Sequence, residues 1–179
     1  QATLRGAIDW LEKVGKTSAK LQNQLKSNHI IAPAQSMLDH ISDLTSLLSS
    51  VAQYCDAQAA GFDNPERRIR FEHGKLPQAL TMLAENLATA SNGALKQFNK
   101  MLALLNEAIK DGELPKHQAE QLLSETGFML QRLENLQKLW KMMAKEDSSK
   151  GAPMARWVEH IVGKQSDYLF NVSPIEVGF

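Results

Sequence analysis

The chain has 179 residues, of which 43% are hydrophobic, 22% charged and 6% aromatic, a composition that excludes a disordered or collagen-like chain. Its 20 Lys and Arg residues balance its 20 Asp and Glu residues, which excludes the strongly basic class of histone-like nucleic-acid-binding proteins. The single cysteine, Cys55, cannot form an internal disulfide or supply a cysteine-ligated metal cluster, and it is typical of a reducing, cytoplasmic location.

Apolar residues recur every three or four positions in the first part of the chain, which is the pattern of helices with one buried face. This pattern predicts a helix over residues 3–26 and, after a break near Pro33, a second helix over residues 34–57. Cys55 lies on the second apolar stripe, so we interpret it as a core residue. Residues 58–77 contain many helix breakers and no periodicity, which predicts a long loop.

The helical pattern resumes at Gln78 and predicts two further long helices. The first is interrupted only by Gly93, which can bend or split a helix, and it ends at Asp111-Gly112. The second follows Pro115 and continues to about residue 145. The helices are expected to form an antiparallel bundle with these core residues: Leu44, Leu48, Leu87, Phe98, Leu133 and Trp140.

The character of the sequence changes after the polar segment 146–153. Residues 155–162 and 168–172 are rich in β-branched and aromatic residues and predict a β-hairpin. Two strands are marginally stable alone, so we expect them to pack on the helices or on a sheet outside this chain. The chain also begins without Met inside an amphipathic pattern, which favours a segment of a longer protein. The predicted fold is mainly α, with a C-terminal hairpin.

Known catalytic motifs are missing from the sequence. It contains no phosphate-binding loop, dinucleotide-binding motif, zinc-protease motif or serine-hydrolase motif. The five histidines are scattered, and the carboxylates fall on the solvent side of amphipathic helices. No apolar run is long enough to cross a membrane. We therefore predict no catalytic residue, metal site or cofactor in this segment, and no membrane partner.

Methionine and tryptophan residues in the last third of the chain allow two interpretations. They form either an adaptable protein-binding surface or gap-filling parts of the core, and the core is favoured. The residues concerned are Met129, Met142, Met143, Met154, Trp140 and Trp157.

Two groups of cationic residues are candidates for phosphate binding, because a nucleic-acid groove needs spaced cations with aromatic residues between them. The first lies in the loop around Phe71, and the second, Lys138, Lys141 and Lys145, lines one helix face. Pairing with neighbouring acids is the competing interpretation for both. The predicted nucleic-acid-binding residues are those of the loop with two more from the hairpin: Arg67, Arg68, Arg70, Lys75, Arg156 and Lys164.

Several short segments, in their order and spacing, resemble DinG-type DNA helicases, in the stretch between the DEAH box and the following helicase motif. They are Ile31-Ala32-Pro33, Arg70-Phe71-Glu72-His73-Gly74-Lys75-Leu76-Pro77, Leu139-Trp140, Gly151-Ala152-Pro153 and Arg156-Trp157. None of them is catalytic. The family is related to XPD and has two RecA-like motor domains, with an iron-sulphur domain and a helical arch inserted into the first.

The resemblance implies that residues 1–150 are the arch and residues 151–179 a hairpin that connects back to a motor domain. The parent protein would be an ATP-dependent 5′-to-3′ helicase of bacterial DNA repair and replication, using ATP, Mg²⁺ and an iron-sulphur cluster bound outside this segment. Single-stranded DNA and the intramolecular motor and iron-sulphur domains would be its partners. The alternative is a freestanding helical adaptor that binds another protein through the methionine-rich surface.

Overall fold

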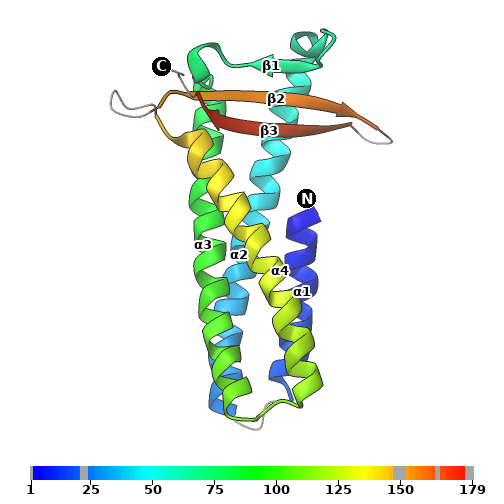
Figure 1. The fold of residues 1–179 in the computed structure, drawn as a ribbon, viewed down its shortest axis with the longest axis vertical. Coiled ribbons are helices and arrows are strands. Elements are labelled where there is room, and N and C mark those ends of the chain that lie inside the picture. Colours follow the sequence, from blue (N-terminus) through cyan, green and yellow to red (C-terminus); the bar gives the residue numbers. More distant parts are fainter. Residues whose placement is uncertain (1, 21–23, 147–151, 164–165, 176–179) are drawn as a thin grey trace. The chain divides into compact units, whose positions relative to one another are not determined.

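The computed structural model describes residues 2–20, 24–146, 152–163 and 166–175. These residues form long helices and a small antiparallel sheet, which confirms the predicted fold class (Figure 1). The helices are α1 (Ala2–Ser18), α2 (Gln24–Ala57), α3 (Gln78–Lys110) and α4 (Lys116–Ala144), and the strands are β1 (Arg68–Arg70), β2 (Met154–Val162) and β3 (Ser166–Pro174). None of the described helices has an apolar stretch long enough to cross a membrane.

The chain folds as two compact units. Unit 1 consists of residues 1–45 and 89–137, and unit 2 of residues 46–88 and 138–179. Helices α2, α3 and α4 each contribute a segment to both units. The division at residue 150, which concerns the connection to a larger protein, stays a prediction.

Unit 1 is a bundle in which successive helices run in opposite directions (Figure 1). Its core contains Trp10 and Phe98, whose ring centroids lie 4.5 Å apart. The indole Nε1–H of Trp10 donates to Thr126 Oγ1 at 3.0 Å, so the polar atom of this buried side chain is satisfied. At the rim, Lys13 Nζ donates to Glu125 Oε2 at 2.8 Å, and this hydrogen bond lowers the pKa of Glu125.

The predicted boundary between the first two helices was wrong. Helix α1 ends at Ser18, where the hydroxyl groups of Thr17 and Ser18 donate to backbone carbonyls one turn earlier. Pro33 lies inside α2, although an interior proline costs about 3 kcal/mol. Ile30, seven residues before Met37, is buried on the same face, so burial of apolar surface outweighs this cost.

Helix α3 continues through Gly93 without a break. A Cβ atom at this position would lie 2.4 Å from Cε1 of the His40 imidazole, closer than two unbonded atoms can approach. Gly93 therefore allows the side chain of His40 on α2 to pack against the backbone of α3.

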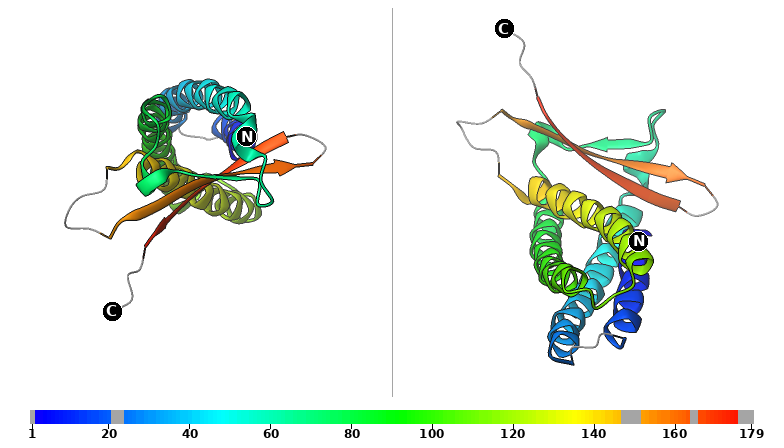
Figure 2. Two further views of the ribbon diagram at one scale, coloured as in Figure 1. Left: turned by 90° about the horizontal axis from the view of Figure 1, so that it is seen from above. Right: turned by 60° about the horizontal axis from the view of Figure 1, so that its bottom comes forward.

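Unit 2 carries the sheet, whose strand order is β1-β2-β3 with antiparallel neighbours. The predicted hairpin is present as β2 and β3, and its twist is visible in Figure 2. Strand β1 lies in the segment predicted as a loop, so that part of the prediction was wrong. Its three residues, Arg-Ile-Arg, are too few for a periodic signal, and pairing with β2 defines them as a strand.

One face of the sheet, the inner face, packs inside unit 2. Val158 and Phe170 face each other across β2 and β3 and are buried, and the ring of Phe170 lies 5.3 Å from that of Trp140. Farther along the strands, the Tyr168 ring stacks on His160 at 5.1 Å, and its Oη–H donates to Asp56 at the end of α2. Helix ends and hairpin thus share one hydrophobic core.

Five of the six residues expected in the core are buried in the two units, namely Leu44, Leu87, Phe98, Leu133 and Trp140. Leu48 is half-buried. Cys55 is 1% exposed, as its place on the apolar stripe predicted, and burial raises the pKa of its thiol to about 11.

Candidate nucleic-acid interface

The outer face of the sheet carries the cationic residues of the predicted loop. Arg68 pairs with Glu159 and Arg70 with Trp157 in the β1–β2 register. Because side chains alternate along a strand and Val158 lies on the buried face, these four residues share the opposite face. Strand β3 adds Leu169, which is 46% exposed. The outer face is therefore an open surface with cationic, aromatic and aliphatic groups.

Two of the cations take part in ion pairs, as the competing interpretation of the loop expected. Arg68 Nη2 lies 2.9 Å from Glu159 Oε1, and Arg70 Nη2 lies 3.2 Å from Glu66 Oε2. The Arg70 and Glu66 side chains are 70% and 58% exposed. An ion pair in that much solvent contributes little, so Arg70 can exchange Glu66 for a phosphate at small cost.

A tight turn presents Arg67 at the edge of β1. Asn64 organises this turn, since its Nδ2 donates to the carbonyls of Gly61 and Arg68, both at 3.0 Å, and its Oδ1 accepts from Arg68 N at 3.2 Å. Arg67 has a left-handed backbone with φ of 47°, and its carbonyl accepts from His160 N at 2.8 Å. Its side chain is exposed, as is that of Lys75.

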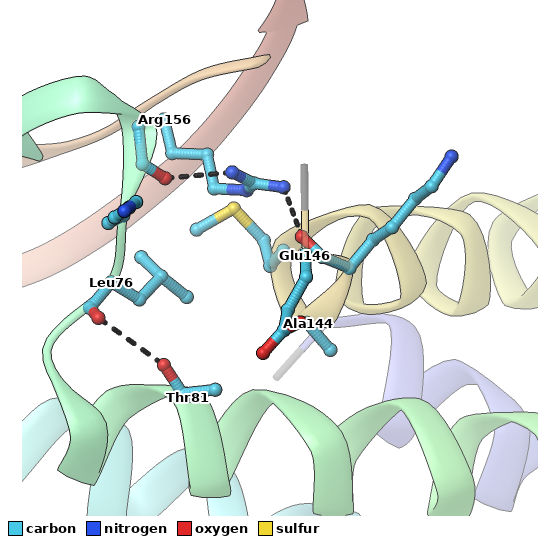
Figure 3. A pocket seen from close by; sticks show the side chains of 9 residues that line it. Leu76, Thr81, Ala144, Glu146 and Arg156 are labelled. Carbon is cyan, nitrogen blue, oxygen red and sulfur yellow. Dashed lines mark hydrogen bonds between the residues drawn. The ribbon is translucent and has the colours of Figure 1, made fainter. Parts of the chain in front are cut away.

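Arg156 departs from the prediction, because it is buried and does not face solvent. Its guanidinium donates to the carbonyls of Met142 and Lys145 at the end of α4 and to that of Gly74 at 2.7 Å. Figure 3 shows Arg156 beside one of the hollows that it lines. The last carbonyls of a helix have no partner within the helix and carry partial negative charge, which suits a buried cation. Arg156 is therefore a bracket that joins α4, β2 and the segment after β1.

Gly74 is required where this bracket meets the chain. Its φ is +67°, and a Cβ atom there would lie 1.9 Å from the Met154 carbonyl oxygen. Only glycine allows the backbone to approach β2 this closely. A hollow of about 380 Å³ lies between Arg156, Leu76 and Thr81 on the helix side (Figure 3).

A second hollow, of about 480 Å³, lies on the sheet side of the bracket. Arg68, Arg70, Phe71, Trp157 and Ile175 form much of its wall. Within the described parts of the chain, no Asp or Glu side chain lines it. We call this space the Trp157 hollow.

The remaining predicted cations add nothing to the candidate interface. Lys164 lies outside the described residues. Lys138, Lys141 and Lys145 are all exposed near the end of α4, where positive charge is favourable beside the helix C-terminus without any ligand.

The methionine-rich cluster contributes to the core, as favoured above. Met129 and Met143 are buried, and Met142 and Met154 are half-buried. Among the described residues, no three His, Cys, Asp or Glu side chains are grouped in a way that could hold a metal ion.

No family model matches the sequence. Over 178 residues, 99% of the chain, it is 39% identical to a protein of Photobacterium profundum that is described as "ATP-dependent DNA helicase DinG". The resemblance to DinG-type helicases is confirmed. The chain spans about a quarter of the length of this relative, with 25% of it covered.

Sequence reasoning missed two residues of the candidate interface. Trp157 was predicted with the core cluster, although its alternation with Val158 already assigned the two side chains to opposite faces. Asn64 was predicted only as part of a loop. Its role depends on β1, which the sequence did not reveal.

Proposed function

We propose that this chain is the DNA-guiding arch segment of an ATP-dependent 5′-to-3′ DNA helicase acting in bacterial DNA repair and replication. The observation that carries the proposal is the 39% identity to a described DNA helicase along almost the whole chain. Long helices with buried stripes are suited to a rigid guide, and the outer face of the sheet offers a surface for a nucleic-acid strand.

ATP hydrolysis is proposed to take place outside this chain. The sequence holds no phosphate-binding loop, so ATP and Mg²⁺ need residues from elsewhere in the parent protein. An iron-sulphur cluster needs several cysteine ligands, whereas this chain has only the buried Cys55. These residues do not fit either group, and both are assigned to the motor and iron-sulphur domains of a cytoplasmic parent protein.

The hairpin is proposed to connect the arch to a motor domain. Strand β3 has a β2 neighbour on one edge, and within the described residues no strand pairs with its other edge. An open edge of nine residues can accept a further strand from the parent protein.

Contact with single-stranded DNA is assigned to the exposed cations Arg67, Arg70 and Lys75, with Arg68 held beside them by Glu159. Single-stranded DNA is a flexible polyanion, and cations on a turn and an edge strand can follow its phosphates. Arg156 is withdrawn from this set because its guanidinium is bound to three backbone carbonyls.

The experiment measures binding of the 179-residue chain to a fluorescently labelled oligothymidylate by anisotropy at several salt concentrations. The double variant is Arg67→Glu with Arg70→Glu. It leaves Arg68 and its ion pair with Glu159 unchanged. Each lost phosphate contact should reduce the slope of log K against log salt by about 0.7 and weaken binding.

The matched control is Lys96→Glu with Lys100→Glu, which makes the same change of charge at exposed positions of α3 in unit 1. We expect the control to keep most of the wild-type affinity and salt slope. Equal effects of the two variants would contradict a DNA contact at β1, and so would a wild-type chain that binds no oligonucleotide.

A further inference from the structure

The Trp157 hollow combines positive charge with aromatic surface. Arg68 and Arg70 give its wall positive charge, and Phe71 and Trp157 give it aromatic surface. A free phosphate would need only the cations, and an apolar peptide would need only the rings. The combination suits a ligand that is both anionic and aromatic, such as one nucleotide of a single strand.

The hollow is held in shape by hydrogen bonds before any ligand arrives. Glu159 Oε1 accepts from Trp157 Nε1 at 2.8 Å and from Arg68 Nη2 at 2.9 Å, so one carboxylate fixes both side chains. The guanidinium carbon of Arg68 lies 5.6 Å from the centre of the Trp157 ring. Phe71 N donates to Arg156 O at 3.0 Å, which ties the Phe71 backbone to β2.

The size and exposure of the hollow also suit a base. Its volume of about 480 Å³ lies within the range of about 300–1,000 Å³ found for small-ligand sites. Trp157 is half-buried and lines the hollow, so it is only partly covered by the protein. Arg70 at the edge is 70% exposed and can reach a phosphate outside the hollow.

We propose that the Trp157 hollow holds one unpaired base of a bound single strand, stacked on the aromatic wall, while Arg70 binds an adjacent phosphate. The inference rests on the proposed function, since it names how the same face holds its DNA. It differs from simple backbone tracking, because the interaction requires a base and not only a phosphate. A base inside a duplex is not available for such stacking, so the hollow selects single strands.

The test compares two oligonucleotides of equal length and charge, one with all its bases and one made of abasic sites. Wild-type chain should bind the intact strand more tightly than the abasic strand. Trp157→Ala should weaken binding of the intact strand by about tenfold and change binding of the abasic strand by less than about twofold. Trp157→Phe, which keeps an aromatic ring, should retain most of the preference for bases.

The matched control is Phe128→Ala, which removes an exposed aromatic ring from α4 in unit 1, outside the outer face and outside the walls of the hollow. It should leave the ratio of the two affinities unchanged, and circular dichroism checks that every variant is folded. If wild-type chain binds both strands equally, the base-binding inference is overturned while the proposed DNA contact stands.

If Trp157→Ala weakened binding of both strands equally, the inference would also be overturned. That result would mean that Trp157 only holds the cationic residues in place and does not contact a base. If Trp157→Ala left binding of both strands unchanged, the inference would be overturned as well. The hollow would then be a candidate binding site for a segment of protein. If wild-type chain binds neither strand, the proposed function fails first.

Discussion

Replacement of Arg156 by methionine tests the bracket between α4, β2 and Gly74. Methionine keeps much of the aliphatic volume but removes every donor, so the carbonyls of Met142, Lys145 and Gly74 lose their shared partner. A buried acceptor without a partner costs about 1–3 kcal/mol, whereas the partly buried carbonyls at the end of α4 cost less because water can reach them. We expect Arg156→Met to lower the free energy of unfolding by about 3 kcal/mol.

Urea denaturation followed by circular dichroism measures this loss. The matched control is Arg70→Met, since Arg70 is 70% exposed and pairs only with an exposed carboxylate among the described residues. The control should cost less than about 0.5 kcal/mol. If the two variants lost equal stability, the guanidinium of Arg156 would not be bound as described, and Arg156 would again be a candidate for DNA binding.

Two further predictions concern α3 and α2. Gly93→Ala should destabilise the chain by about 1–3 kcal/mol, because the new methyl group meets the His40 ring, although helix propensity alone would add about 1 kcal/mol of stability. Adding His40→Ala to the Gly93→Ala chain should remove this loss of stability. Gly127→Ala should be stabilising, because a Cβ atom at this position meets no neighbouring side chain within 4 Å. Thermal unfolding measures the stability of all three variants. Because burial raises the pKa of Cys55 from 9.0 to about 11, the thiol favours the fold below pH 9, and this contribution is lost as the pH rises towards 11. The urea midpoint should therefore fall between pH 9 and 11 more steeply in wild-type chain than in Cys55→Ala, and parallel curves would contradict a buried thiol.

The candidate interface was accessible to sequence analysis only in part. The cations around Phe71 could be found because they stand together in a segment without helical periodicity, and the structure places Arg67, Arg70 and Lys75 at exposed positions. Arg156 has the same chemistry and the opposite location. A sequence does not tell whether a cation near the end of a helix will face water or the helix carbonyls, because that depends on how close the strand and the helix lie.

Local periodicity determined the long helices, since a stripe of apolar residues every three or four positions can be buried only on one face of a helix. It was also sufficient to place Cys55 and Phe98 inside the molecule. The β-branched and aromatic composition of residues 155–162 and 168–172 determined the hairpin. Tertiary structure decided the features that depend on residues far apart in the chain. Strand β1 exists because β2, from the last part of the chain, pairs with it, and Pro33 remains helical because Ile30 and Met37 are buried on either side of it. Trp157 faces the hollow for the same reason. The register between the strands and the packing of the inner face on the helices determine which side chains lie on the outer face.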